Sequence, residues 1–229
     1  NRGALHEVGE QLDVFNHLTK WCARTTESSE IPGLVHQAME QLTTGRPRPV
    51  EIEIPWDILP DQTEIELLEQ EVHPKTRPEP KEVKEAAEAL AHAERPLIWA
   101  GGGAREADLS HELLELAQAL NAPVITTPEG KGALPEDNSL SLGTIYNGHG
   151  AGHHAVPQAD VILAIGSRMH MVPPVDWSPQ PHQKLIQIDA DPEELGRNIP
   201  VTTGMAADGR LALQDLLAEL GGKTRASQW

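Results

Sequence analysis

In the second half of the chain two kinds of segment alternate, and they differ in how their apolar residues are spaced. Some short segments are apolar almost throughout, which is typical of buried strands: 96–100, 123–127, 161–165 and 184–189. Other segments carry apolar residues at helical spacing: 83–93, 109–120, 211–220 and, more weakly, 151–158. Buried strands separated by helices indicate a parallel sheet covered on both faces. We therefore predict a doubly wound, Rossmann-like α/β domain over residues 83–221, followed by a short tail at 222–229.

The first part of the chain has a different pattern. Helical spacing over 31–44 begins with Pro32 and ends before Gly45, and apolar residues then alternate with Glu51 and Glu53 over 49–55, as in a half-buried strand. One helix and one strand are too little to enclose a core. Residues 1–58 are thus predicted to be part of an incomplete α/β domain, which docks on the following domain or pairs across a dimer because its strand edge is exposed.

Between these regions, residues 59–82 are rich in proline and charge. Pro60, Pro74, Pro78 and Pro80 deny helix and strand their backbone donors, so we predict a semi-rigid linker and a domain boundary here. The acidic residues of this segment are expected to form a solvated face; they are Glu64, Glu66, Glu69 and Glu71.

Composition narrows the class of protein. The chain is 38% hydrophobic and 23% charged, as expected of a globular fold, and its formal charge of −17 disfavours nucleic acid and membranes as partners. No stretch approaches the about 20 apolar residues of a membrane span, and no signal sequence opens the chain. The single cysteine, Cys22, fits a cytoplasmic location and is predicted to be a small buried apolar residue rather than a nucleophile.

Candidate chemistry lies where the predicted strands end. Gly101, Gly102 and Gly103 follow the first strand, and Thr126 and Thr127 close the second. Gly166, Ser167 and Arg168 follow the third, and Asp189 closes the fourth. Ligands bind at this edge of open parallel sheets, so glycines, a cation and a carboxylate here indicate a nucleotide site. The alternative is that the glycines serve only the turns, since Glu106 breaks the G-x-G-x-x-G fingerprint.

Three histidines lie in a glycine-rich loop, at His149, His153 and His154. Imidazole is a common zinc ligand, but neither an acidic residue nor a thiol lies nearby in the sequence. We expect exposed loop histidines here and no metal site.

The ordered set of motifs resembles thiamine-diphosphate-dependent enzymes of the acetolactate synthase type. The first part of the chain resembles the end of their pyrimidine-binding domain, through Leu18–Trp21, Ile31–Pro32 and Gly45–Pro55. The rest resembles their central domain, through Gly101–Gly103, Ala122–Val124, Lys131–Gly132, Leu142–Gly143, Ala159–Arg168 and Ile188–Pro192. The resemblance covers nearly the whole chain.

The resemblance implies a parent enzyme that decarboxylates or ligates 2-keto acids. In this family thiamine diphosphate lies between the pyrimidine domain of one subunit and the diphosphate domain of its partner, with Mg²⁺ held by a Gly-Asp-Gly…Asn-Asn signature. The chain is expected to begin after the activating glutamate and to stop before the diphosphate domain. It would then be inactive alone and would need the missing domains in a homodimer or homotetramer. Leu5-His6-Glu7 departs from the Phe-Gln-Glu of acetolactate synthases. The resemblance therefore supports the reaction class, decarboxylation or ligation of 2-keto acids, more strongly than acetolactate formation itself.

In some members of the family the central domain binds FAD, in others ADP, and in many nothing. The resemblance places the following residues where flavin-binding members contact their nucleotide: Arg46, Gly101, Gly102, Thr126, Gly143, Gly166, Arg168, Asp189 and Asp208. The alternative is a domain that only braces the subunit.

Two further hypotheses are of other classes. A stand-alone nucleotide-binding module would fold from Asn1 onward and bind its ligand without any missing domain. A sirtuin-like NAD hydrolase also places glycines after its first strand, but a single cysteine excludes its usual four-cysteine zinc module.

Overall fold

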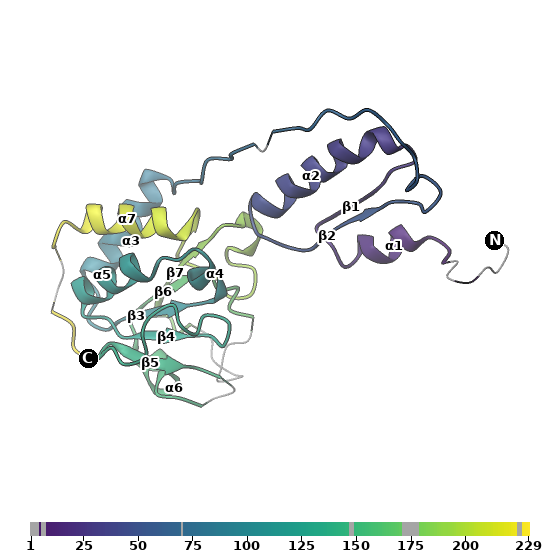
Figure 1. Cartoon of the computed structure of the whole chain (residues 1–229). Helices are drawn as coiled ribbons and strands as arrows, with labels where there is room; N and C mark the ends of the chain where they lie inside the picture. The colour runs from purple at the N-terminus through teal and green to yellow at the C-terminus, as the bar shows by residue number, and fades with distance from the viewer. Residues whose placement is uncertain (1–4, 6–7, 70, 147–148, 171–178, 224–225) are drawn as a thin grey trace. The chain divides into compact units, whose positions relative to one another are not determined.

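The computed structural model divides the chain into two compact units, Asn1–Pro74 and Lys75–Trp229 (Figure 1). It describes residues 5, 8–69, 71–146, 149–170, 179–223 and 226–229. The division falls inside the segment predicted to be a linker.

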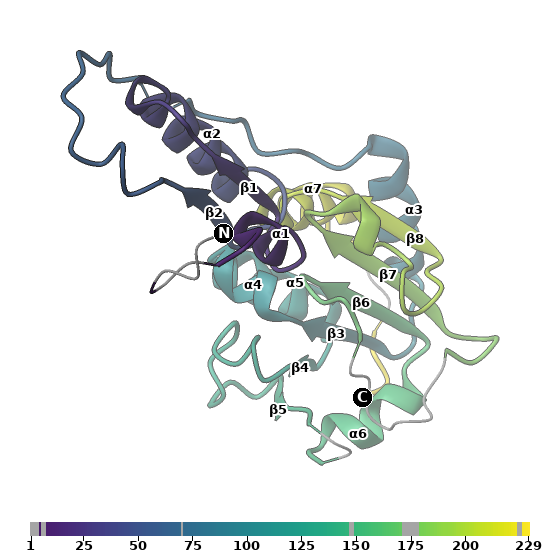
Figure 2. The same ribbon diagram turned by 90° about the vertical axis from the view of Figure 1, so that its right-hand side faces the viewer.

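The larger unit contains a six-stranded parallel sheet, as the sequence predicts. Its strands are β3 (Pro96–Ala100), β4 (Val124–Thr126), β5 (Ser141–Thr144), β6 (Val161–Ile165), β7 (Lys184–Asp189) and β8 (Thr203–Ala206). Their order in the sheet is β5-β4-β3-β6-β7-β8, which Figure 2 lets the reader follow across the unit. The chain thus winds outward from β3 in one direction and then from β6 in the other. The doubly wound prediction is confirmed, with the topological switch between β3 and β6.

Helices cover both faces of this sheet (Figure 1). They are α3 (Pro80–Ala91), α4 (Gly102–Glu106), α5 (Ser110–Leu120), α6 (Gly152–Ala155) and α7 (Gly209–Leu220), with 3₁₀ turns η2 (Val156–Gln158) and η3 (Pro192–Glu194). Along β3, Ile98 and Ala100 join the core formed with α3, α5 and α7, whereas Leu97 and Trp99 join the core formed with α6 and η2. Because successive side chains point to opposite faces, a strand buried on both faces is apolar at every position.

The predicted element boundaries are confirmed for β3, β6 and β7, and nearly so for α5 and α7. Asn121 ends α5 in the left-handed conformation (φ 46°), as its position suggests. The helix predicted over 83–93 is shifted: α3 begins at Pro80 and ends at Ala91, so the last residues of the predicted 59–82 linker are helical. Pro80 lies in the first turn, where its missing N–H costs nothing.

The smaller unit contains α1 (Gln11–Asn16), β1 (Trp21–Arg24), the 3₁₀ turn η1 (Ser28–Glu30), α2 (Ile31–Thr43) and β2 (Val50–Glu53). The predicted helix and strand are confirmed as α2 and β2, but the expectation of an unpaired strand was wrong. β2 pairs with β1 in parallel, from Trp21 opposite Val50 to Arg24 opposite Glu53. Among the described residues of this unit only Thr25 and Ala38 are buried, so the unit has almost no core of its own.

Residues 59–79 form neither helix nor strand wherever the structure describes them. Within the smaller unit, part of this segment runs beside α2. The four glutamates predicted to form a solvated face are all exposed. None of the helices among the described residues combines the length and the hydrophobicity of a membrane span.

Candidate nucleotide site at the carboxyl edge of the sheet

The predicted nucleotide residues gather at one edge of the larger unit, with one exception. Gly101 and Gly166 directly follow β3 and β6, Thr126 and Asp189 end β4 and β7, and Asp208 follows β8. Gly102, Gly143 and Arg168 lie beside them in α4, in β5 and in the loop after β6. All six strands are parallel, so these positions share the carboxyl edge. Arg46 belongs to the smaller unit, and its role stays a prediction.

At the switch point the glycine backbones of two turns touch. The N–H of Gly101 donates to the carbonyl of Ile165 (2.8 Å), and that of Gly103 donates to the carbonyl of Gly166 (3.1 Å). A Cβ atom on Gly101 would lie 2.2 Å from the oxygen of Gly166, and one on Gly166 would lie 2.6 Å from Cα of Gly103. Glycine is therefore required at both positions by the close approach of α4 to the end of β6.

The neighbouring glycines have separate structural causes. A Cβ atom on Gly102 would lie 3.1 Å from Cβ of Glu129, a tight contact that a small shift could relieve. Gly143 has a φ of 73° and sits in a register shift, because Val124 pairs with Ser141 while Thr126 pairs with Thr144. The extra residue forms a bulge, for which glycine in the left-handed region is favoured.

Two polar side chains of the edge are bound to their neighbours in the fold. The hydroxyl groups of Thr126 and Thr144 lie 3.0 Å apart, across the pair of strands β4 and β5. The carboxylate of Asp189 accepts a hydrogen bond from the backbone N–H of Asp191 (3.0 Å). Thr126 and Asp189 are both buried.

Asp208 caps α7 and holds the start of the unit. Its carboxylate accepts from the N–H of Leu211 (3.1 Å) and from the Lys75 ammonium (2.8 Å), and its own N–H donates to the carbonyl of Thr76 (2.9 Å). Burial alone would raise the pKa of Asp208, but the hydrogen bonds from Lys75 and Leu211 and the charge of Lys75 outweigh it and lower that pKa. The carboxylate is thus held in its ionised form.

Arg168 is the remaining charged group at this edge. Its backbone carbonyl accepts from the Asn198 side chain (2.7 Å), whereas its guanidinium has no hydrogen bond or ion pair with another described residue. A half-buried guanidinium in this position suits an anion, and it is the one predicted side chain here that is uncommitted among the described residues.

Sequence reasoning missed Gln187, a buried residue that organises this edge. Its amide nitrogen donates to the carbonyls of Ser167 and Glu194 (both 3.1 Å), and its amide oxygen accepts from the N–H of Gly196 (2.9 Å). The side chain therefore ties the loop after β6 to the loop after β7. The signal in the sequence was a single uncharged polar residue inside the buried run from Leu185 to Ile188.

The three histidines and the cysteine are not among the predicted nucleotide residues. His149 and His154 are exposed as predicted, whereas His153 is half-buried with its ring 5.5 Å from that of His154. The described residues contain no group of three or more His, Cys, Asp or Glu side chains arranged to hold a metal ion. The prediction that Cys22 is buried was wrong: it is half-buried, with Sγ 3.8 Å from Oδ1 of Asn16.

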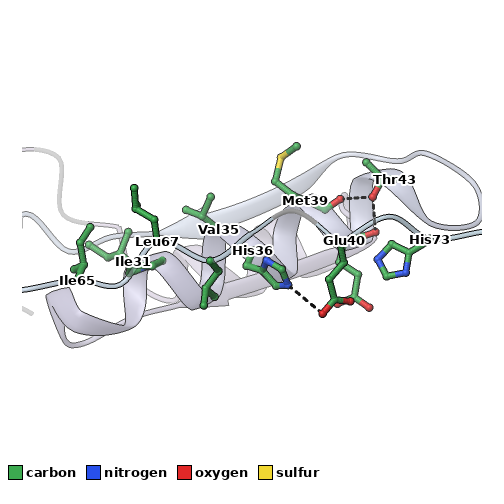
Figure 3. A pocket seen from close by; sticks show the side chains of 12 residues that line it. Ile31, Val35, His36, Met39, Glu40, Thr43, Ile65, Leu67 and His73 are labelled. Carbon is green, nitrogen blue, oxygen red and sulfur yellow. Dashed lines mark hydrogen bonds and ion pairs between the residues drawn. The ribbon is translucent and has the colours of Figure 1, made fainter.

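A cavity of about 370 Å³ lies in the smaller unit, between α2 and the extended segment that follows β2 (Figure 3). Its wall is mainly apolar, with Ile31, Val35 and Met39 on α2 facing Ile65 and Leu67. None of the predicted nucleotide residues lines it. The cavity is therefore a separate feature and not the candidate site.

The fold and the glycine-lined edge define a doubly wound α/β domain of the Rossmann type, the class in which nucleotide sites are common. The sequence matches the family described as "Thiamine pyrophosphate enzyme, central domain" over residues 83–216, which is more than half of the chain. The chain belongs to this family, and its likeness to acetolactate synthases confirms the resemblance noted from the motifs.

Known relatives extend the match to both units. A probable acetolactate synthase large subunit of Methanocaldococcus jannaschii is 38% identical over 95% of this chain and 38% of its own length. A probable 2-ketoarginine decarboxylase of Pseudomonas aeruginosa is 31% identical over 98% of this chain and 40% of its own length. The chain thus spans about two fifths of the curated relatives that it matches.

Solved structures agree on the fold. The benzoylformate decarboxylase of Polynucleobacter necessarius superposes with a TM-score of 0.79, covering 92% of this chain and 40% of that one. At 22% identity this likeness supports the fold alone.

Proposed function

We propose that this chain forms the central scaffold of a thiamine-diphosphate-dependent enzyme that decarboxylates or ligates 2-keto acids, of the acetolactate synthase type. The observation that carries the proposal is the central-domain match over residues 83–216, supported by the six-stranded doubly wound sheet. The relatives include synthases and decarboxylases, so the reaction class is proposed and the particular 2-keto acid is left open.

In this proposal the chain acts together with protein regions that it does not itself contain. The relatives are about two and a half times as long, as their 38% and 40% coverage implies. We propose that thiamine diphosphate and Mg²⁺ bind to the remaining pyrimidine and diphosphate regions, within a cytoplasmic homodimer or homotetramer, and that this chain alone is inactive. Thiamine diphosphate would supply the carbanion that attacks the 2-keto acid. The residues of this chain would position the two flanking regions.

The resemblance also allows FAD or ADP at the carboxyl edge of the central domain. The shared position of Gly101, Thr126, Gly166 and Asp189 at this edge favours such a site, and Arg168 offers it a cation. The hydrogen bonds that Thr126 and Asp189 already make within the fold favour the alternative, a domain that only braces the subunit. The proposed function therefore rests on the scaffold role, whichever of the two holds.

Activity measurements on two proteins test the proposal. One is this chain, and the other is the product of the whole reading frame in which its sequence occurs. Each is assayed for carbon dioxide release and for carboligation products, with thiamine diphosphate, Mg²⁺ and a panel of 2-keto acids. We expect turnover by the longer product and none by the chain.

Turnover by the chain alone would overturn the proposal that it is inactive. A reading frame that adds no flanking domains would favour a stand-alone nucleotide-binding module instead, which predicts tight binding of FAD, NAD or ADP by the chain without any activity.

A further inference from the structure

We infer that the carboxyl edge of this sheet is a closed structural brace, so that neither FAD nor ADP binds there and the residues of the apparent nucleotide site stabilise the domain instead. The inference deepens the proposed function and rests on it only for the choice of these two ligands. It would hold whichever 2-keto acid the enzyme uses.

Two backbone donors of the turn after β3 are already engaged within the fold. At a nucleotide site of this fold, N–H groups of the turn after the first strand point at the diphosphate. Here the N–H groups of Gly101 and Gly103 donate to the carbonyls of Ile165 and Gly166. Because a Cβ atom on Gly101 would already lie 2.2 Å from the oxygen of Gly166, the two turns touch, and a phosphate does not fit between them.

Side chains at this edge are likewise engaged within the fold. The Thr126 hydroxyl is paired with Thr144, and the carboxylate of Asp189 accepts from the N–H of Asp191. Asp189 is buried, and one oxygen of its carboxylate already accepts from that N–H, so a ribose hydroxyl would have to reach a side chain that the fold encloses. Thus the predicted contacts of a nucleotide are replaced by contacts within the fold.

Asp208 also makes its contacts at this edge within the fold. It binds Lys75 and the N–H of Leu211 through its carboxylate, and Thr76 through its own N–H. These three contacts fix the segment that enters the larger unit to the first turn of α7. Arg168 is left as the one predicted side chain without a described partner, and a single half-buried guanidinium adds little affinity because water and salt screen it.

Ligand binding is tested on the purified chain by two measurements. Thermal unfolding is followed with and without FAD or ADP, and the protein is also denatured so that any released flavin or adenine nucleotide can be separated and quantified. A ligand at about 100 times its Kd would raise the Tm by about 5–10 °C. We expect no rise with either ligand and no released nucleotide.

The brace is tested by Asp208→Ala, with Asp137→Ala as the matched control. Asp137 is exposed, and its side chain has no hydrogen bond or ion pair with another described residue. We expect Asp208→Ala to lower the Tm by about 2–4 °C, because an N-cap is lost, and Asp137→Ala to leave it unchanged.

Two results would overturn the inference. One is saturable stabilisation by FAD or ADP, or nucleotide released on denaturation, that Arg168→Ala abolishes. The other is an unchanged Tm for Asp208→Ala, since the edge would then not act as a brace. Neither result depends on catalytic turnover, so a failure here is distinct from a failure of the proposed function.

Discussion

The carboxylate of Asp160 accepts two hydrogen bonds from the chain just before β3, one from the N–H of Arg95 (2.8 Å) and one from that of Glu94 (2.7 Å). The N–H of Asp160 in turn donates to the carbonyl of Arg95 (3.2 Å). One residue before β6 therefore fixes the entry of β3, the neighbouring strand at the topological switch. At the switch point, the amino ends of β3 and β6 are thus joined by a side chain, whereas their carboxyl ends are joined by backbone contacts of Gly101, Gly103 and Gly166.

We expect Asp160→Ala to destabilise the larger unit by about 1–2 kcal/mol, because two backbone N–H groups lose a charged acceptor. Urea unfolding measures the change, with Asp137→Ala as a control for the loss of one negative charge. Equal midpoints for the two variants would show that water replaces the carboxylate without cost.

Two helical glycines are expected to respond in opposite ways to alanine. At Gly33 in α2 no atom lies within 4 Å of an added Cβ, so Gly33→Ala should stabilise the helix by about 0.5 kcal/mol. At Gly152 in α6 an added Cβ would lie 2.5 Å from Cγ2 of the fully buried Ile125. Gly152→Ala should therefore destabilise the larger unit by about 1–3 kcal/mol, because the core is overpacked.

Hydrogen exchange of the α2 amides measures the first effect, and thermal unfolding measures the second. The pair separates helix propensity from packing, since propensity alone predicts stabilisation at both positions. Stabilisation by Gly152→Ala would mean that Ile125 moves aside freely.

The strands that the sequence predicted are those buried on both faces, where nearly every side chain is apolar. In β3, Leu97 and Trp99 fill one core while Ile98 and Ala100 fill the other, so the strand is apolar at every position and easily recognised. The edge strands β5 and β8 were missed. They are short, and each contains a glycine, Gly143 or Gly204, which weakens a strand pattern.

The position of the candidate site could be predicted from the sequence, but the contacts of its residues could not. Strand ends can be read from the sequence, so Gly101, Gly166 and Asp189 were correctly placed at one edge. Whether their donors are free depends on which strands are neighbours, and the contact of Gly101 with Gly166 exists only because β6 lies beside β3. The contact of Asp208 with Lys75 joins residues far apart in the chain and has no local signal.

Glu51 is expected to destabilise the smaller unit when it is ionised. Burial, and next the negative charge of Glu53, raise the pKa of Glu51. The folded state then binds a proton more tightly than the unfolded state, so stability falls as the pH rises through the raised pKa. Glu51→Gln should therefore slow hydrogen exchange of the β1 and β2 amides at neutral pH, and the gain should vanish at a pH below the pKa of an unfolded glutamate.

Glu53→Gln is the matched control on the same strand. Glu53 pairs with Arg24 (2.6 Å), so its substitution should speed exchange or leave it unchanged. Slower exchange in both variants would show that general acidity, and not the position of Glu51, sets the effect.

Stability is expected to depend on pH in the opposite direction at Asp208, whose pKa is lowered. Burial opposes ionisation there, but Lys75 and the N–H of Leu211 prevail. A carboxyl group with a lowered folded pKa contributes stability above its unfolded value of about 3.9 and loses it as the pH falls through the folded pKa. Asp208→Asn keeps a side chain able to cap α7 but removes the charge. We therefore expect the variant to be less stable than the wild type at neutral pH, with a difference that shrinks as the pH falls below about 4.

Urea midpoints across this pH range measure the difference between wild type and Asp208→Asn, and Lys75→Ala separates the contribution of the ion pair. If Lys75 is the main source of the lowered pKa, Lys75→Ala should reproduce most of the loss at neutral pH. Lys81→Ala is the control, because Lys81 is exposed and lies 3.8 Å from Glu85 on the same helix. A difference between wild type and Asp208→Asn that stays constant down to acid pH would instead assign the loss to the cap, because the charge would then contribute nothing.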